Sequence, residues 1–422
     1  MKKQKVFRSK RFTIAILLLI TFTTIYFIAK PLQFKNGIWK GVIQRADGQK
    51  IVFNFETKDS VGKKVIYVIN GKERLLVDSI IFRNDSVFIQ MPFFASGFEA
   101  KINEDGNLQG VWIRDLGTYK QSLPFYATYN QKKRFEIKAP PIANISGRWS
   151  ANFTGANNTV AELVGEFSQV GSYLTGTFRE PTGDYRFLEG VVSGDSLKLS
   201  SFDGSHSFLF TAKIDNKNKI SGGKFYAGIL AEQNWSAERN DNAELPEASG
   251  ETKITTGSDK LNFSFQDMVD GHMVSLSDKQ FKNKVMVITI MGSWCPNCMD
   301  EAKFLTDYYE KNQDKGLEII GLSFERTSDF AKSQKSLQPF KKRLGVTYPV
   351  LITGITVGEI VDGSKTLPPI ERIVAFPSTI FVDKKGNIRK ITNGFDGPAT
   401  GVHHVIFKKD FDKIVTDLLN EK

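Results

Sequence analysis

The sequence predicts a multidomain chain with an N-terminal membrane segment, two antiparallel all-β repeats and a C-terminal α/β domain. Three patterns support this organisation: a basic head before an uncharged apolar run, short alternating strands separated by Gly-containing turns, and buried strands that alternate with helical segments. Of the 422 residues, 41% are hydrophobic and 12% are aromatic. This composition can fill two or three cores and excludes a mostly disordered chain.

The predicted membrane segment comprises residues 1–30. Six Lys or Arg residues precede residue 12, and residues 12–29 carry no charge. A helix of that length spans roughly 27 Å, close to the hydrocarbon thickness of a bilayer. The segment is either an uncleaved signal anchor or a cleaved signal peptide, and both export the rest of the chain. The bulky Phe27, near a cleavage position that requires small residues, favours the anchor.

The charge of the chain gives no indication of nucleic-acid binding. The formal net charge is +11, but seven Lys or Arg residues and no Asp or Glu lie within residues 1–30. The remaining chain is only mildly basic and has no concentrated basic stripe. We therefore expect no nucleic-acid partner.

Residues 31–240 read as two copies of one antiparallel meander, each a small barrel or sandwich. The NGIW sequence at 36–39 recurs as SGRW at 146–149, and three further segments recur at the same spacing: 85–89 at 195–199, 98–102 at 210–214, and 108–112 at 220–224. The offsets are 110 to 112 residues. Self-similarity at one period predicts duplicated domains, here 31–140 and 141–240.

A polar linker, 241–257, leads to a different pattern in residues 258–422. Buried strands are expected at 285–291 and 317–324, with helices at 300–312, 328–344 (interrupted near Pro339) and 407–419. Residues 375–382 and 388–391 are expected to form an antiparallel hairpin around a Gly-Asn turn. This alternation predicts a mainly parallel sheet covered by helices.

Both cysteines lie in the sequence Trp294-Cys295-Pro296-Asn297-Cys298, where a buried strand passes into a helix. Unpaired N–H groups at a helix N-terminus favour the thiolate, which is the nucleophile in disulfide exchange. Cys295, at the helix cap, is therefore expected to be the exposed attacking residue. Cys298, one turn deeper, would resolve the mixed disulfide. Pro296 suits the first helical turn, where its missing N–H is not needed.

Other uses of this motif fit the sequence less well. A zinc site would need further ligands, but the chain has two Cys and four His without matching spacing. Haem attachment requires His after the second cysteine, where this chain has Met299, and a peroxidatic site requires Thr or Ser at the position of Gly292. A structural disulfide closing so short a loop would add little stability. A redox-active pair remains.

Residues from about 258 to 422 resemble the thioredoxin fold and, within it, the TlpA/ResA-like family of membrane-anchored extracytoplasmic thiol-disulfide oxidoreductases. The motifs that carry the resemblance are FSF at 263–265, WCPNC at 294–298, YPVL at 348–351, and FPST at 376–379 followed by FVDKKG at 381–386. The resemblance covers about 40% of the chain and does not include the β repeats.

The resemblance implies roles for residues outside the cysteine motif. Pro377 falls where the fold places a cis-proline facing the cysteines, so that the backbone at Phe376 can pair with a client; the alternative is an ordinary turn proline. Glu301 matches a partly buried Glu that tunes cysteine ionisation and accepts the proton of Cys298; the alternative is a first-turn Glu that favours the helix dipole. Trp294 is expected to pack over the cysteine pair.

Two functions are compatible with these features. The first is a reductase of disulfides in exported proteins, which in family terms supports cytochrome c maturation or general thiol reduction. It would be supplied by a membrane electron donor of the DsbD or CcdA type, and would need no cofactor or metal beyond the Cys295–Cys298 disulfide. The second is a tethered binding module, in which the β repeats bind a client or a small apolar ligand. Residues 353–372 are either a lid or docking loop or a surface insertion, and His403 and His404 are given no role.

Overall fold

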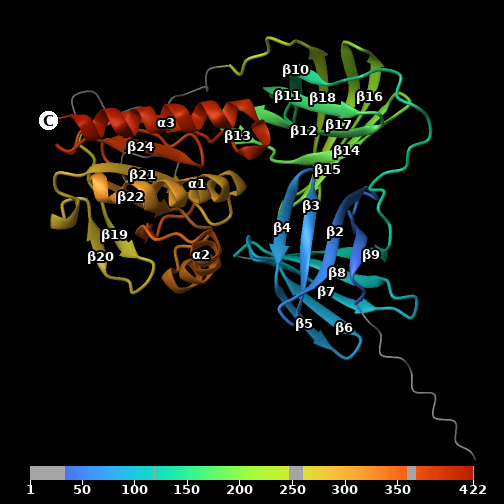
Figure 1. Ribbon diagram of the computed structural model, residues 1–422, viewed down its shortest axis with the longest axis horizontal. Helices are drawn as coiled ribbons and strands as arrows, with labels where there is room; N and C mark the ends of the chain where they lie inside the picture. Colours follow the sequence, from blue (N-terminus) through green and yellow to red (C-terminus); the bar gives the residue numbers. More distant parts are fainter. Residues whose placement is uncertain (1–33, 118, 247–259, 359–366, 422) are drawn as a thin grey trace, which may run out of the picture.

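The computed structural model describes residues 34–117, 119–246, 260–358 and 367–421 (Figure 1). The two all-β domains and the α/β domain of the predicted fold class are present in it. The predicted membrane segment, 1–30, and most of the predicted linker, 241–257, lie outside the described residues. Within the described part of the chain, no helix combines the length and the apolar character needed to cross a bilayer.

The first β domain is a nine-stranded antiparallel sheet in the order β4-β3-β2-β1-β9-β8-β7-β6-β5. Its strands are β1 (Gly37–Gln44), β2 (Lys50–Ser60), β3 (Lys63–Asn70), β4 (Glu73–Val77), β5 (Ser79–Arg83), β6 (Ser86–Gln90), β7 (Ser96–Ile102), β8 (Leu108–Asp115) and β9 (Lys120–Tyr129). The sheet curves around a core that contains the fully buried Trp39 and Trp112 and the ring of Phe53. The two edge strands, β4 and β5, are joined through Asp78.

The second β domain repeats this arrangement and closes it. Its strands are β10 (Gly147–Thr154), β11 (Val160–Val170), β12 (Tyr173–Glu180), β13 (Gly183–Asp184), β14 (Leu188–Ser193), β15 (Ser196–Phe202), β16 (Ser207–Asn216), β17 (Lys219–Ala227) and β18 (Ala231–Arg239). Strand β12 pairs with β11 on one side and with β14 on the other, so eight strands form a closed sheet. The two-residue strand β13 pairs only with the end of β12.

Strand positions and register agree with the repeat seen in the sequence. Trp39 and Trp149 occupy the same place in β1 and β10, and each indole N–H donates to the carbonyl four residues earlier. Ile89 pairs with Phe98 in the first domain, and Leu199 pairs with Phe210 at the equivalent place in the second. The offset between the copies is therefore 110 residues in the first strand of this pair and 112 in the second.

The two β domains share a buried interface. The rings of Phe53 and Phe202 stack 4.3 Å apart, and Trp112 Nε1 donates to the carbonyl of Gly204 at 2.8 Å. The side chain of Arg134 lies between the domains, where it pairs with Glu189 at 3.2 Å. Because apolar and charged groups are both buried here, the two β domains pack as one unit.

The C-terminal domain is built on a seven-stranded sheet in the order β20-β19-β23-β22-β21-β24-β25. Its elements are β19 (Ser264–Asp267), β20 (Met273–Ser275), β21 (Val285–Met291), α1 (Pro296–Asn312), β22 (Leu317–Ser323), α2 (Phe330–Leu344), β23 (Val350–Ile352), β24 (Ser378–Val382), β25 (Ile388–Asn393) and α3 (Val402–Asn420). The central strands β21, β22 and β23 are parallel, and β24 and β25 form the predicted antiparallel hairpin.

Three helical predictions need correction, and for α3 the observed start, Val402, lies five residues before the predicted one. Helix α2 continues through Pro339 instead of breaking there, with Asp329 capping its first turn by accepting from the Lys332 N–H at 2.8 Å. Helix α1 begins at Pro296, four residues before the predicted start, because the apolar spacing used for the prediction starts later than the cap. The long connection 353–372 is described at its two ends, where Thr353 bonds to Ser323 and Leu367 is fully buried.

Candidate active site

The cysteine motif lies where β21 passes into α1. All seven residues of β21 are buried, and Cys295 is the N-cap of α1, with extended backbone angles. Its Sγ accepts the N–H of Cys298 at 3.2 Å, and Pro296 occupies the first helical position. The predicted placement of Cys295 at a helix cap is therefore correct, and the sulfur lies against the free N–H groups of the helix.

The predicted exposure of Cys295 is wrong. Its residue surface is 3% exposed, compared with 1% for Cys298. The sulfur lies in a cluster that also holds Phe94 from the first β domain. Helix-cap geometry alone leaves such a position open, so the burial of Cys295 comes from the residues packed around the cap in the folded protein.

Glu301 is buried beside the cysteines and does not lie in the first turn of α1. The Thr289 and Thr379 hydroxyls donate to its carboxylate at 2.5 and 2.6 Å, and it is 1% exposed. Burial raises the pKa of Glu301 to about 7, against the two hydroxyl bonds, which lower it. Burial also raises the pKa of the Cys298 thiol, and the neighbouring Cys295 and the charge of Glu301 add to this effect.

Phe376 and Pro377 lie directly before β24, the strand that pairs with β21 on the side away from β22. Their peptide bond is cis, and the Cys295 thiol donates to the carbonyl of Phe376 at 3.4 Å. The ring centroids of Phe376 and Trp294 are 5.2 Å apart. Trp294 belongs to the same cluster as both cysteines, and its indole folds back over Gly292 to donate to the Phe324 carbonyl at 2.8 Å.

Glu325, which was not among the predicted site residues, also supports the redox loop. We use this name for residues 292–295, between β21 and α1. The buried carboxylate of Glu325 accepts the N–H and the hydroxyl of Ser293 at 2.8 and 2.6 Å, and the Ser323 hydroxyl at 2.6 Å. Burial raises its pKa. A carboxylate directly after a buried parallel strand was the available signal, because the ends of neighbouring parallel strands meet at one edge of the sheet.

Contacts between domains were also missing from the sequence analysis. Arg186 of the second β domain pairs with Asp300 Oδ2 at 2.6 Å and donates to the Pro296 carbonyl at 3.2 Å, both in the first turns of α1. His403, to which no role was given, lies 2.9 Å from Glu166 and 3.1 Å from Arg179. Both sets of contacts join the second β domain to the C-terminal domain.

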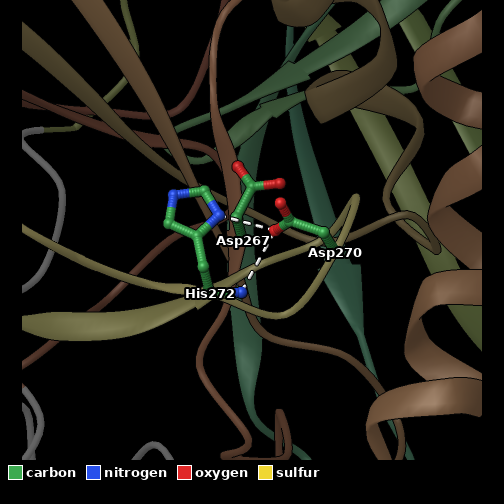
Figure 2. Close-up of side chains that lie close together, drawn as sticks. All are labelled: Asp267, Asp270 and His272. Atoms are coloured by element: carbon green, nitrogen blue, oxygen red, sulfur yellow. Dashed lines mark hydrogen bonds and ion pairs between the residues drawn. The ribbon is translucent and has the colours of Figure 1, made fainter.

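A further titratable cluster lies in the β19–β20 hairpin and consists of Asp267, Asp270 and His272 (Figure 2). Candidate ligand atoms of the three side chains lie within 4.8 Å of one another. Their hydrogen bonds close the turn: Asp267 accepts from the Val269 N–H at 2.7 Å, and Asp270 accepts from the N–H of His272 at 3.1 Å. These contacts explain the cluster as a hairpin turn, so we assign it no metal.

The fold and the cysteine geometry define the C-terminal domain as a thioredoxin-fold thiol-disulfide oxidoreductase domain. Residues 257–391 match the model of the AhpC/TSA family. The chain is 26% identical over 146 residues to the thiol-disulfide oxidoreductase ResA of Bacillus subtilis, covering 35% of this chain and 72% of that protein. It is 29% identical over 140 residues to ResA of Bacillus cereus, covering 33% and 70%.

Similar solved structures cover the same region. A thioredoxin-family thiol:disulfide interchange protein from Chlorobium tepidum is 21% identical, covers 40% of this chain and 100% of its own, and has a TM-score of 0.30. A secreted thiol-disulfide isomerase from Corynebacterium glutamicum is 19% identical, with coverages of 41% and 95% and a TM-score of 0.31. These matches, like those to ResA, cover only the C-terminal part of the chain.

Proposed function

We propose that the chain is a membrane-anchored thiol-disulfide reductase of exported proteins, with cytochrome c maturation as one client pathway. In this proposal, residues 1–30 hold it in the inner membrane and the bulk of the chain lies in the periplasm. The observation that carries the proposal is the position of Cys295 at the N-cap of α1, with Cys298 buried one turn behind it. No cofactor or metal is needed beyond the cysteine pair.

The exchange proceeds in two balanced steps. The Cys295 thiolate attacks a client disulfide, which breaks as a mixed disulfide forms and the first client thiolate leaves. Cys298 transfers its proton to Glu301, whose pKa of about 7 suits a proton acceptor, and attacks Cys295 Sγ. The Cys295–Cys298 disulfide forms and the second client thiolate leaves. The client gains two electrons, which a membrane donor of the DsbD or CcdA type restores to the protein.

Insulin reduction by the full chain in detergent tests this function. We expect turnover in the wild type, none in Cys295→Ser, and a trapped mixed disulfide in Cys298→Ser. A reduction potential of about −270 mV or lower fits a reductase, whereas a value of about −120 mV would indicate an oxidant. A folded wild-type chain that exchanges with neither insulin nor a small dithiol would refute the proposal.

The role of Glu301 has its own test. Glu301→Gln should slow resolution by Cys298 by roughly 10²-fold at neutral pH, because the proton acceptor is lost. The rate should also lose its dependence on an ionisation near pH 7. Glu310→Gln, an exposed carboxylate on the same helix, is the matched control and should behave as the wild type. An unchanged pH profile in Glu301→Gln would exclude this role.

The second candidate function is a tethered binding module whose β domains hold a client or a small ligand. The low exposure of Cys295, 3%, favours it, because a recognition domain does not need an open sulfur. It predicts client binding that is equal in the wild type and in Cys295→Ser. Client capture that depends on Cys295 would favour the reductase.

A further inference from the structure

A turn of the second β domain contacts the two residues between the cysteines, Pro296 and Asn297. We call residues 181–187, between β12 and β14, the docking turn. In the amide orientation that satisfies both groups, Asn297 donates to the Asp184 carbonyl and accepts the Asp184 N–H, each at 3.2 Å. Asn297 lies between the two cysteines, so the motif itself is paired with a backbone segment of another domain.

Arg186 joins three domains at this point. Its guanidinium pairs with Asp300 at 2.6 Å and donates to the Pro296 carbonyl at 3.2 Å, and it also pairs with Glu73 of the first β domain. The side chain is 8% exposed. Breaking a buried ion pair by removing one partner is strongly destabilising, because the remaining charge is left without compensation. Arg186 therefore makes separation of the docking turn from α1 costly.

Backbone shape and a second carboxylate complete the contact. Gly183 has a φ of 149°, and a Cβ at this position would overlap the amide of Asn297, so only glycine permits this approach. The Asp184 carboxylate accepts the Arg186 N–H at 2.6 Å and the Gly397 N–H of the C-terminal domain at 2.8 Å. The docking turn is thus bonded to the C-terminal domain at two places, the start of α1 and Gly397.

We propose that the docking turn is a built-in cap over the client face of the Cys295-Pro296-Asn297-Cys298 motif, latched by Arg186. A client segment reaches Cys295 only after it displaces this turn. The Asn297 side-chain amide bonds both the carbonyl and the N–H of Asp184, so in this proposal the docking turn and a client backbone compete for the same amide groups. The cap deepens the proposed function and rests on it for the identity of the client, a disulfide-bearing extended segment.

Thiol accessibility in the full chain tests the cap. In a Cys298→Ser background Cys295 is the sole thiol, and its reaction with N-ethylmaleimide and with a polyethylene-glycol maleimide is timed. Arg186→Gln and Gly183→Ala should each react on the order of tenfold faster than the parent, because both loosen a buried contact. The increase should be larger for the bulky reagent, which needs a wider opening.

Arg343→Gln is the matched control. Arg343 pairs with Asp78 at 2.5 Å between the first β domain and α2, but the pair is partly exposed and does not touch the motif. Its loss should leave the alkylation rate within about twofold of the parent, because surface pairs contribute little. Circular dichroism and urea unfolding establish that each variant is folded. Gly183→Ala keeps the test usable if Arg186→Gln fails to fold.

The outcomes separate the cap from the proposed function. Folded cap variants that alkylate no faster than the parent would overturn the cap, and insulin reduction by the wild type would still support the reductase. Faster alkylation with no insulin reduction by any variant carrying both cysteines would support the cap and overturn the reductase. Faster alkylation together with faster insulin reduction supports both.

Discussion

The two β domains have the same strand topology over most of their nine strands, and they differ at the fourth strand. In the first domain, β4 (Glu73–Val77) pairs with β3 along five residues. At the same offset in the second domain only Gly183 and Asp184 pair, and the rest of the segment leaves the sheet to contact α1. Along its first half, Tyr173 to Gly176, β12 pairs with β14, and this pairing closes the second sheet.

This difference shows where a duplicated fold can diverge without losing its core. The buried Trp39 and Trp149 hold equivalent positions in β1 and β10, because a core position must keep its volume. The docking turn, which faces the C-terminal domain, has little strand pairing and instead contacts the cysteine motif and the start of α1. Glu73 is the first residue of β4, and Arg186 follows β13, the equivalent strand of the second domain. The two side chains form an ion pair with each other. The proposed cap therefore arises where the repeat is broken.

The largest expected effect tests the shared core. Trp39→Ala and Trp149→Ala should each lower the free energy of unfolding by about 3–5 kcal/mol, because each removes a fully buried indole and its hydrogen bond. Urea denaturation of the full chain gives both values. A loss below about 1 kcal/mol in one variant alone would break the equivalence of the two domains.

The next effect is pH-dependent and should have opposite signs in the two domains. Burial, with the charge of Asp300 adding to it and Arg186 opposing it, raises the pKa of Asp184 from 3.8 to about 7. The stability linked to this group is present below pH 4 and is lost as the pH rises to 7. Relative to Asp184→Asn, the wild type should lose about 2–4 kcal/mol over that range.

Asp78 of the first domain is the matched comparison. Its hydrogen bond from Arg343 lowers its pKa, so its contribution is present above the ordinary value of 3.8 and is lost as the pH falls through the lowered value. The effect should be small, because the pair is partly exposed. Urea unfolding from pH 3 to pH 8 measures both. A pH dependence of stability with the same sign in Asp184→Asn and in Asp78→Asn, each relative to the wild type, would contradict the contrast between the domains.

A third experiment measures how much Glu73 of the first β domain contributes to holding the docking turn in place. Glu73→Gln should raise the alkylation rate of Cys295 about threefold, less than Arg186→Gln, because Arg186 keeps its pair with Asp300. The same maleimide assay reports it. An effect as large as that of Arg186→Gln would show that the turn is held by the contact between the two β domains and not by the pair of Arg186 with Asp300.

The smallest effect concerns a position where the domains carry different residues. Phe125 lies opposite Ile43, and Trp235 lies opposite Phe153 in the equivalent register. The buried Trp235 Nε1 has no hydrogen-bond partner among the described residues. Trp235→Phe should change the free energy of unfolding by less than about 1 kcal/mol, because relief of the unpaired N–H offsets the lost packing. A loss of several kcal/mol would show that the indole has a packing role of its own.

The order of secondary structure, the duplication and the position of the cysteine pair could be predicted from the sequence alone. Hydrophobic alternation, turn residues and a short motif after an apolar run are local signals, and each reports on neighbours along the chain. Glu301 and Pro377 required a family resemblance, since nothing in their local sequence distinguishes a site residue from a helix or turn residue.

Tertiary structure alone decided how open the site is. Cys295 is buried in a cluster that includes Phe94, which lies far from it in the sequence, and the ion-pair partners of Arg186 come from the first β domain and the C-terminal domain. Helix-cap geometry predicts a favourable environment for a sulfur anion, but access depends on the packing of whole domains. Long-range packing leaves no periodic signal in the chain, and therefore the contacts of the docking turn and of His403 could be recognised only in the folded protein.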